Sequence, residues 1–532
     1  MAVATESPAD PQRPSEPPAA VVRGVDGAVA GVVAAGVALA ASELVCGLAG
    51  SQPSLITAVG TQFIDRFAAS LKDLAIALFG TNDKVALITG IVVVSLLLGA
   101  VLGKAAVRRP IVGVVGFLAF GAVGMFSYLD DPQGTAWVGI VAAVVAAAAG
   151  IGTLFGLLHL LRLERTATGT DGGRADPGGD SRRLFLISAG SLAVLAAGAA
   201  VLGRRLGRSD VVESVRAATD LPTPATQVPV PAGELPDVQG LSSYITPNVG
   251  FYRIDTALVV PQVDVAGWKL RIEGEVDHPY ELTFDELVAM ADFEDTVTLQ
   301  CVSNEVGGNL VGNATWQGVQ LATLLDRAGV RPTGTQIVGH SVDDFTAGFP
   351  TDVGLDGRTA MVAVAMNGEP LPAEHGFPAR LIVAGLYGYV SATKWLDAIG
   401  LLPWEEFDGY WVPRGWSKEG PIKTASRIDV PRSGATLDAG QQAIAGVAWQ
   451  PTLGIERVEV QVDDGPWTVA TLGDVTSGNT WVQWYAPWNA TSGEHRIRVR
   501  ATNTAGVTQT EERADPAPDG ATGWHTRTVK VR

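Results

Sequence analysis

The chain has 532 residues, of which 17% are charged, and its formal net charge at pH 7 is −17. That charge is divided unevenly, because residues 1–209 carry a net +2 and residues 210–532 a net −19. A near-neutral first part rich in Ala, Val, Gly and Leu is therefore joined to an acidic second part of soluble composition. So acidic a half argues against nucleic acid as a partner, since phosphate binding relies on clustered Lys and Arg.

The first part contains apolar stretches long enough to cross about 30 Å of hydrocarbon as helices of about 20 residues. Residues 1–22 are expected to be a disordered N-terminus. A predicted membrane region over 23–163 then holds four such stretches, near 27–48, 84–103, 110–128 and 136–160. Residues 182–208 hold a fifth, near 184–203. The segment 55–80 is interrupted by charged residues, and we expect an amphipathic or extracytoplasmic helix there rather than a span.

The positions of Lys and Arg orient these spans, because cytoplasmic loops collect positive charge. Asp130 and Asp131 lie on the side opposite the positive loops. Arg204, Arg205 and Arg208 follow the fifth span and are positive on the side where this rule expects few Lys and Arg. The positive residues between the second and third spans and between the fourth and fifth are Lys104, Arg108, Arg109, Arg162, Arg165, Arg174, Arg182 and Arg183. We therefore expect a multi-pass cell-membrane protein with a cytoplasmic N-terminus and an extracytoplasmic second half.

The membrane half carries few groups that could do chemistry. His159 is its only histidine, so one chain cannot supply paired axial ligands to a haem within the membrane. Glu43, near the end of the first span, is the only carboxylate inside a span. A transporter with an appended domain predicts polar residues along the spans. The sequence favours an anchor instead.

Composition divides the rest of the chain into linkers and two domains. Residues 164–181 form a predicted cytoplasmic linker and 209–239 a Pro-rich extended linker. Residues 240–425 mix a strand pattern, "GWKLRIEGEV", with a helical pattern behind a Thr cap, "TFDELVAMA". Residues 426–532 are short alternating strands with turn signals. The expected fold class is an all-α membrane anchor, an α+β domain and an all-β immunoglobulin-like sandwich.

The stretch "VTLQCVSNEVGG" over 297–308 places Cys301 between an apolar strand and loop-forming residues. A cysteine at a strand end is more often a small buried core residue than a functional one. Cys301 is, however, the only cysteine of the second half, because the chain's other thiol is Cys46. A thiolate in such a place can hold a soft metal centre whose remaining ligands come from a cofactor.

This stretch, followed by "HGFPARLIVAGLYGYVSATKWL" over 375–396, resembles the sulfite oxidase family of molybdopterin enzymes. The resemblance covers residues 240–425, and the sandwich resembles that family's C-terminal dimerisation domain. In the family, one cysteine thiolate ligates molybdenum, and a pterin dithiolene and oxo groups complete the centre. The resemblance implies a molybdenum-dependent oxidoreductase with a molybdenum–molybdopterin cofactor.

The resemblance also assigns roles to residues of this chain. Cys301 is the implied metal ligand and, with Asn304, the implied catalytic residue. Arg380 suits a pterin phosphate because its guanidinium is a planar fork of donors. The implied cofactor-binding residues are His375, Arg380, Thr393 and Lys394, with weaker matches at Asn248, Tyr252, Arg253 and Ser341.

Departures from the family pattern bear on the substrate. Glu305 and Val306 stand where sulfite-oxidising members have arginine, and Glu305 has the wrong charge for an anionic pocket. Phe345 replaces the family's active-site tyrosine, and Ala384 replaces a proline. Two reactions therefore stay open: sulfite-oxidase-like oxygen-atom transfer with two electrons, and reduction of an S-oxide or N-oxide such as methionine sulfoxide.

The chain has no CxxCH motif for attaching a haem of its own. Electrons are therefore expected to pass to or from a separate partner, a cytochrome or a membrane quinone system. Besides the membrane and a small-molecule substrate, a second copy of the chain is an expected partner, through the sandwich. A rival from another class is a non-catalytic cell-surface binding protein. That rival predicts no bound molybdenum and full function after Cys301→Ser.

The stretch "SRRLFL" over 181–186 matches a twin-arginine export signal placed inside the chain. A molybdopterin enzyme receives its cofactor in the cytoplasm, and the twin-arginine route moves folded cargo. Arg182 and Arg183 would then direct the fifth span and the loaded domain behind it. The alternative is that they are ordinary positive residues at a cytoplasmic flank.

Overall fold

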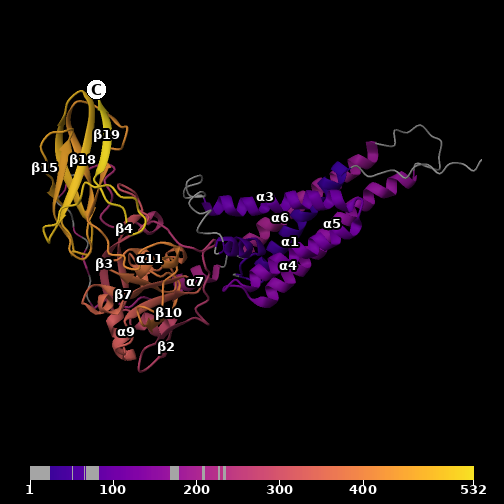
Figure 1. Ribbon diagram of the computed structural model, residues 1–532, viewed down its shortest axis with the longest axis horizontal. Helices are drawn as coiled ribbons and strands as arrows, with labels where there is room; N and C mark the ends of the chain where they lie inside the picture. Colours follow the sequence, from indigo (N-terminus) through magenta and orange to yellow (C-terminus); the bar gives the residue numbers. More distant parts are fainter. Residues whose placement is uncertain are drawn as a thin grey trace, which may run out of the picture. The chain divides into compact units, whose positions relative to one another are not determined.

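The computed structural model describes residues 24–50, 52–64, 66, 83–167, 179–206, 210–225, 228–229, 231, 235 and 237–532. They form two compact units, a helical unit (1–130 with 134–207) and a β-rich unit (131–133 with 208–532). Figure 1 shows long helices in the first unit and the strands in the second. The expected disordered N-terminus, most of the linker 164–181 and the second half of the segment 55–80 lie outside the described residues.

The helical unit is built from α1 (Gly24–Leu48), α3 (Asp83–Ala106), α4 (Pro110–Leu129), α5 (Ala136–Ala167) and α6 (Gly179–Leu206). Within the described residues, all five contain a stretch long and apolar enough to cross a membrane. A shorter apolar helix covers Leu55–Ile64. The five apolar spans expected from the sequence are confirmed in length and composition.

Glycines let α1 approach two other helices closely. A Cβ added at Gly31 of α1 would lie 2.0 Å from the carbonyl oxygen of Gly99 in α3. At the other end of α1, a Cβ at Gly47 would lie 2.1 Å from the carbonyl oxygen of Gly203 in α6. Small residues at such crossings are typical of packing between membrane helices.

An ion pair accompanies the contact between α1 and α6. Arg204 Nε lies 3.4 Å from Oε2 of Glu43, whose side chain is buried. Both residues lie near the C-terminal ends of their helices. Helices α1 and α6 therefore run parallel to each other.

The first part of the β-rich unit holds two sheets. One has the order β2-β1-β10-β5-β6 and the other the order β3-β4-β7-β8, with β9 paired to β7. The strands are β1 (Lys269–Gly274), β2 (Tyr280–Thr283), β3 (Phe293–Gln300), β4 (Val311–Gln320), β5 (Gln336–Ser341), β6 (Thr346–Pro350), β7 (Ala360–Met366), β8 (Glu369–Pro370), β9 (Arg380–Val383) and β10 (Leu396–Leu402). Helices α8 (Phe284–Ala289), α9 (Leu321–Ala328), α10 (Thr351–Leu355) and α11 (Gly388–Ser391) connect them.

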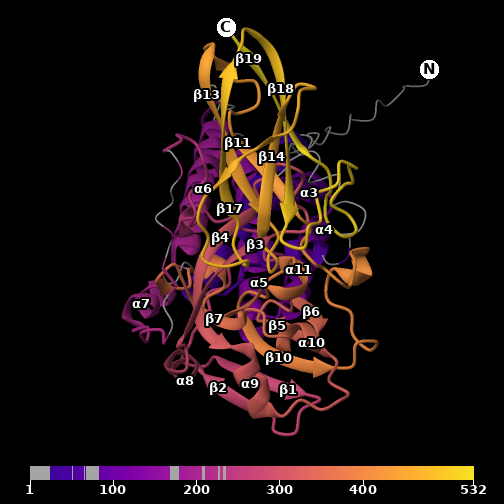
Figure 2. The same cartoon turned by 90° about the vertical axis from the view of Figure 1, so that its left-hand side faces the viewer.

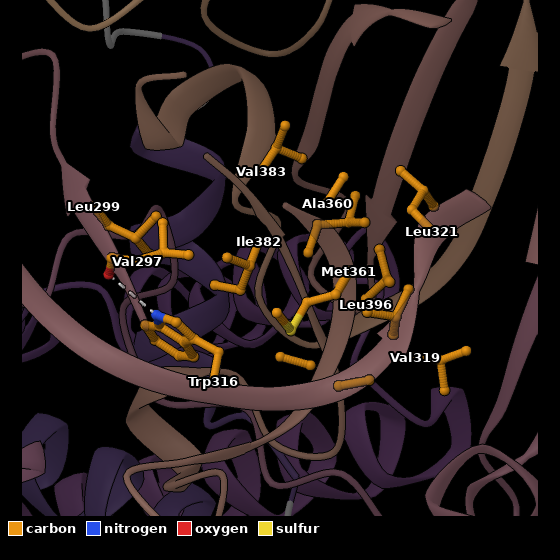
Figure 3. Packing of buried hydrophobic residues seen from close by; sticks show 14 of the residues in the cluster. Val297, Leu299, Trp316, Val319, Leu321, Ala360, Met361, Ile382, Val383 and Leu396 are labelled. Atoms are coloured by element: carbon orange, nitrogen blue, oxygen red, sulfur yellow. Dashed lines mark hydrogen bonds between the residues drawn. The ribbon is translucent and has the colours of Figure 1, made fainter. Parts of the chain in front are cut away.

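Local sequence explains several of these elements. The expected Thr cap is present in α8, where Thr283 and Glu286 form a reciprocal capping box. Every residue of β7, "AMVAVAM", is buried, as a continuous apolar run predicts for a strand covered on both faces. Figure 3 shows Met361 of β7 among Trp316, Ile382 and Leu396, which come from three other strands. The core of this domain therefore lies around β7.

The second part of the β-rich unit is a sandwich of two sheets, ordered β11-β13-β17-β16 and β12-β19-β18-β14-β15. Its strands are β11 (Ala425–Val430), β12 (Thr436–Leu437), β13 (Gly440–Trp449), β14 (Ile455–Val462), β15 (Thr468–Val469), β16 (Thr471–Leu472), β17 (Val482–Ala490), β18 (Gly493–Asn503) and β19 (His525–Val531). Trp484, Val458 and Ile497 belong to the core between the sheets. Figure 2 shows the long strands of the sandwich running alongside one another. The expected fold class is confirmed.

The segment after the last span differs from the extended linker expected over 209–239. Helix α7 (Asp210–Ala218) begins it, and Val212 of this helix is buried in the domain core. Further along, Gln317 Nε2 donates to the carbonyl oxygen of Pro222 at 2.7 Å, and Ala225 N–H donates to that of Asp292 at 2.7 Å. The described residues of this segment are thus held by the domain rather than free of it.

Candidate functional site

Cys301 follows β3 directly and opens the loop that leads to β4. Its backbone N–H donates to the carbonyl oxygen of Leu310 at 2.9 Å, which closes the loop, and only 7% of the residue is exposed. Burial raises the pKa of Tyr387 to about 12, and the Cys301 thiolate contributes to that shift. Burial and the same thiolate also raise the pKa of Tyr252. Two phenols therefore lie within electrostatic reach of the sulfur.

Asn304 is placed to shape this loop. Its Oδ1 accepts a hydrogen bond from the Leu310 N–H at 2.8 Å, and its own N–H donates to the carbonyl oxygen of Cys301 at 3.0 Å. The side chain is almost fully buried. In the structure Asn304 thus fixes the conformation of the loop that presents the sulfur.

His375 and Arg380 are brought together with Lys394 by a glycine turn. Gly376 has φ 113°, and a Cβ there would lie 3.0 Å from Lys394 Cβ and 3.2 Å from Arg380 Cβ. Only glycine accepts both the backbone conformation and the close approach. The motif "HGFPAR" is therefore spatially joined to Lys394, as the sequence resemblance implies.

Arg380 lies deep in the domain. Its guanidinium stacks over the Trp316 ring at 4.9 Å, and its Nη1 donates to the carbonyl oxygen of His375 at 3.0 Å. Its Nε is buried without a hydrogen-bond partner among the described residues. Burial lowers the pKa of Arg380 to about 10. A buried cation with a spare donor is suited to an anionic group of a ligand.

Lys394 and Arg253 share one carboxylate. Lys394 Nζ lies 2.6 Å from Asp255 Oδ2 and donates to the carbonyl oxygen of Glu374 at 3.2 Å. Arg253 Nε lies 2.8 Å from the same Asp255 oxygen. Burial lowers the pKa of Lys394 to about 8, although Asp255 opposes the shift.

His375 is held in one tautomer by the loop that carries Asn248. His375 Nε2 lies 2.8 Å from the carbonyl oxygen of Asn248, which can only accept. Burial lowers the pKa of His375 to about 4, and Arg380, Lys394 and Arg253 add to the shift. The neutral ring therefore donates from Nε2 and keeps Nδ1 as an acceptor.

The remaining predicted residues are buried nearby. Thr393 Oγ1 donates to the carbonyl oxygen of Gly339 at 3.4 Å, which ties it to β5. Ser341, at the end of β5, accepts from the Asp343 N–H at 3.4 Å. Burial raises the pKa of Asp343, and Asp255 and Lys394 also act on it, which places the Ser341 loop near the Lys394 group.

Sequence reasoning missed several residues of this region. Asp255 joins Lys394 to Arg253, and the short charged pattern of "RID" was the available signal. Trp316 and Tyr387 come from other elements, and no local pattern marked them. Tyr410 lies beside Phe345, with ring centroids 5.7 Å apart, so a phenol stands next to the position where the family's tyrosine is absent.

The residues present fit a pterin with a phosphate. Arg380, Lys394 and Arg253 all lower the pKa of His375, so the three cations lie close to one another. Asp255 is the carboxylate that pairs with Lys394 and Arg253. The spare Nε of Arg380 adds a donor. The Cys301 sulfur, in turn, is a ligand suited to a soft metal whose other ligands belong to the cofactor.

A separate pocket of about 420 Å³ lies between the Cys301 loop and the sandwich. Val306 lines it from the loop, and β18 contributes two guanidinium groups, which share Asp464 at 2.8 and 2.9 Å. Arg513 makes no ion pair with another described residue in the structure. The lining residues are Val306, Arg496, Arg498, Glu511, Arg513, Gly523, Trp524, His525 and Thr526.

His525 presents a hydrogen-bond donor at this pocket. The Ile428 N–H donates to its Nδ1 at 2.9 Å, so the neutral ring carries its proton on Nε2. Burial lowers the pKa of His525 to about 4, and the Arg527 and Arg427 guanidinium groups add to the shift. The ring packs on Gly307, where a Cβ would lie 2.2 Å from Nε2.

Comparison with known proteins identifies the domain that contains these residues. Residues 257–411 match the family model of the oxidoreductase molybdopterin binding domain. The mitochondrial sulfite oxidase of Homo sapiens is 30% identical over 273 residues, which is 43% of this chain and 50% of that protein. The uncharacterized oxidoreductase YuiH of Bacillus subtilis is 35% identical over 157 residues, 30% of this chain and 76% of that protein.

Among solved structures, the sulfane dehydrogenase SoxCD from Paracoccus pantotrophus matches with a TM-score of 0.47 and 24% identity, over 55% of this chain and 82% of that chain. The chain spans about half the length of the mitochondrial sulfite oxidases it matches.

The α+β domain, its buried cysteine and the family match define a molybdopterin-binding oxidoreductase. The expected enzyme class and the molybdenum–molybdopterin cofactor are thereby confirmed. The chain belongs to the sulfite oxidase family of molybdopterin oxidoreductases. The roles of the individual site residues and the domain limits stay predictions.

Proposed function

We propose that this protein is a membrane-anchored, extracytoplasmic oxidoreductase that oxidises a small oxyanion such as sulfite. The reaction SO₃²⁻ + H₂O → SO₄²⁻ + 2 H⁺ + 2 e⁻ balances with water as the oxygen source and a separate electron acceptor. The bound molybdenum cofactor supplies two-electron oxygen-atom transfer. The protein supplies one thiolate ligand, an anchored pterin and the electrostatics of the substrate pocket.

The observation that carries the anionic substrate is the pocket between the Cys301 loop and the sandwich. The loop carries Glu305 and Val306 in place of a positive charge. The sandwich lines the pocket with Arg496, Arg498 and Arg513 against one carboxylate, Glu511, and Asp464 pairs with the first two arginines, so Arg513 is the cation left for a ligand. Guanidinium groups and a neutral His N–H donor together suit an oxyanion. The charge absent from the loop sequence is thus available from elsewhere in the fold.

Cofactor binding is proposed for the buried cluster. Cys301 would hold the molybdenum, and Asn304 would keep its loop in place. Arg380, Lys394 and Arg253 would hold the pterin phosphate, and His375 Nδ1 would accept from a pterin N–H. The other residues proposed to surround the cofactor are Tyr252, Asn248, Thr393 and Ser341.

The second candidate reaction is reduction of a neutral S-oxide or N-oxide. It is favoured by the apolar Val306 on the loop and by Phe345, which has no hydroxyl. A neutral substrate would gain little from the guanidinium groups, so this reaction ranks second.

The proposed location follows from the helical unit. The parallel α1 and α6 support an odd number of spans, and the positive residues between spans support a cytoplasmic N-terminus. Arg183 is exposed at the start of α6, while the side chain of Arg182 lies outside the described residues. We propose export of the folded, loaded domain by the twin-arginine route, a cytochrome or quinone system as electron acceptor, and dimerisation through the sandwich.

The test uses the full-length protein purified from membranes. We expect one molybdenum per chain by metal analysis, its loss in Cys301→Ser, and sulfite oxidation with an artificial acceptor. Arg513→Ala is expected to raise KM for sulfite roughly 10- to 100-fold, the effect of losing a charged hydrogen bond, with unchanged molybdenum content. Arg457→Ala is the matched control, since Arg457 lies on the same sandwich and outside the pocket.

Three outcomes contradict the proposal. A folded, metal-free protein that keeps its function in Cys301→Ser would favour a binding protein. Turnover of methionine sulfoxide without turnover of sulfite would favour the second reaction. An unchanged KM in Arg513→Ala would remove the pocket from substrate binding.

A further inference from the structure

The segment that leads from the last span is docked along the catalytic domain. We call residues 210–225, with Val228, the strap. Val212 is 4% exposed within the domain core, and Val215 and Leu221 pack against the same core. The Val228 N–H donates to Glu294 Oε1 at 3.2 Å. The strap therefore contacts the domain along its described length.

Arg216 makes the most specific of these contacts. Its Nη2 donates to the carbonyl oxygen of Pro370 at 3.0 Å, and its Nε lies 3.4 Å from the same oxygen. Its Nη1 pairs with Glu213 of the same helix at 2.5 Å. The side chain of Arg216 is 13% exposed, whereas that of Glu213 is 72% exposed. A nearly buried guanidinium thus holds one carbonyl oxygen of β8.

Pro370 belongs to a hairpin that holds the loop of Asn248. The turn between β7 and β8 contains Asn367, whose φ is 53°, and its Nδ2 donates to Asn248 Oδ1 at 2.7 Å. Asn248 Nδ2 in turn donates to the carbonyl oxygen of Met366 at 3.3 Å and to the carboxylate of Glu369. The residue directly before Pro370 is therefore a partner of Asn248.

The turn at Asn248 is exposed between two held flanks: the Thr246 N–H donates to the carbonyl oxygen of Asn313 at 2.8 Å, and Phe251 is buried against Trp316 and His375. Residues Asn248–Gly250 form one 3-10 turn with no buried residue, and Val249 is 94% exposed. Yet the carbonyl oxygen of Asn248 lies 2.8 Å from His375 Nε2, and the carbonyl oxygen of His375 accepts from Arg380. Hydrogen bonds thus connect the strap, through the hairpin and this loop, to the buried arginine of the cofactor pocket.

We propose that Arg216 is a positioning residue for the cofactor pocket, acting through the β7–β8 hairpin and the Asn248 loop. The inference rests on the proposed pocket, because His375 and Arg380 are its members. The partners that hold the Asn248 side chain at this exposed turn, Met366, Asn367 and Glu369, all belong to the hairpin, so a shift of the hairpin moves the turn. Retention of the cofactor therefore depends on the strap, the part of the domain nearest in sequence to the membrane span.

The experiment compares Arg216→Ala with Glu213→Ala in the full-length protein in detergent. Glu213→Ala removes the ion pair but leaves the bonds to Pro370, so it is the matched control. Hydrogen exchange is measured over 246–251 and 366–370, and molybdenum loss is followed by metal analysis after dilution. We expect Arg216→Ala to speed exchange in both segments and molybdenum loss about tenfold, the value of one charged hydrogen bond. Arg216→Lys, which keeps a donor and the charge, should restore much of the difference.

Two results would overturn the proposal. One is exchange and molybdenum loss in Arg216→Ala equal to those in Glu213→Ala. The other is faster exchange throughout the sandwich as well, which would indicate general destabilisation. A wild-type protein without molybdenum would refute the proposed function instead, and the exchange measurements would still decide the role of Arg216.

Discussion

At the scale of single residues, the buried cations Lys394 and Arg380 carry the proposal that this pocket binds an anion. Burial lowers the pKa of Lys394 to about 8 and that of Arg380 to about 10, because desolvation disfavours the charged forms. Asp255 offsets this cost for Lys394, while Arg380 has an aromatic ring and one carbonyl oxygen as neighbours. An incoming phosphate would supply the missing negative charge. The residues whose charged forms are disfavoured by burial are thus those proposed to bind the cofactor.

His525 leads to a prediction about acid stability. Burial lowers its pKa to about 4, so at pH 5 the folded protein holds it neutral while the unfolded chain protonates it. Its contribution is present above the ordinary histidine pKa and is lost as pH falls from about 6.5 towards 4, by about 2 kcal/mol at pH 5. His525→Gln, which keeps an acceptor for the Ile428 N–H, should reduce the difference in free energy of unfolding between pH 7 and pH 5. Chemical denaturation at the two pH values measures it.

His495 provides the control for that measurement. Its hydrogen bond to Asp463 raises its pKa, so its stabilisation is present at low pH and is lost as pH rises through the raised value. His495→Gln should therefore leave the acid loss as large as in the wild type or larger. An acid loss that is the same in His525→Gln and the wild type would contradict the assignment to His525.

The residues near the site also show what the sequence could reveal. Cys301, His375, Arg380 and Lys394 were predictable because each lies in a compact motif whose order along the chain is informative. Asp255 and Trp316 were not, since their roles depend on partners more than 60 residues away. Arg498 reads as an ordinary alternating strand residue, and only the packing of the sandwich brings it to Val306. Local patterns reveal motifs, but not the distant groups that charge a pocket.

At the scale of elements, the sandwich holds the loop of Cys301 at three points. Trp449 Nε1 of β13 donates to Gln300 Oε1 at 2.7 Å, directly before the cysteine. Arg427 Nη1 of β11 donates to the carbonyl oxygen of Gly308 at 3.0 Å, and His525 of β19 packs on Gly307. The sandwich therefore helps to place Cys301, the proposed metal ligand, in addition to any role in the proposed dimerisation.

Gly307 leads to a prediction for this loop. Its φ is 77°, and a Cβ there would lie 2.2 Å from the His525 ring, so Gly307→Ala meets both backbone strain and a clash. Gly434 has a similar φ of 73° with nothing within 4 Å of its Cβ position, so Gly434→Ala meets the backbone strain alone. We expect Gly434→Ala to cost about 1 kcal/mol and Gly307→Ala at least about 2 kcal/mol, with reduced molybdenum content only in the latter. Equal molybdenum content in the two purified variants would contradict the role given to the loop.

The strap shows why some elements escape a reading of the sequence. Its Pro-rich composition predicts an extended backbone, and composition alone then predicts a free tether. Its partners, Gln317, Asp292 and Pro370, are far away in the chain and carry no complementary pattern. The strands and the capped helix α8, by contrast, depend on neighbours in sequence and were predictable.

At the scale of the whole molecule, two units solve different packing problems. The β-rich unit buries large side chains such as Trp316 and Trp484. The helical unit buries Phe117 and Tyr128 as well, but α1 meets α3 and α6 through small residues. In lipid, apolar side chains gain little by leaving the hydrocarbon, so close contact between backbones is the available source of stability. The glycines of α1, α3 and α6 are therefore positions where size matters more than polarity.

Two glycines of α3 test this view. A Cβ at Gly99 would lie 2.6 Å from both Ala35 Cβ and the Gly31 carbonyl oxygen, whereas one at Gly90 has nothing within 4 Å. Gly99→Leu should destabilise the helical unit by about 1–3 kcal/mol through overpacking, and Gly90→Leu should not. Thermal aggregation of the detergent-purified protein measures the difference. Equal midpoints for the two variants would contradict the packing of α1 on α3.

The ion pair between Glu43 and Arg204 makes the packing of α1 depend on the presence of α6. If the last helix is delivered after the first four, an early intermediate displays a carboxylate within the lipid and a shallow notch at Gly47, both unmatched. When α6 packs against α1, Arg204 pairs with Glu43 and Gly203 fills the space at Gly47 in the same event.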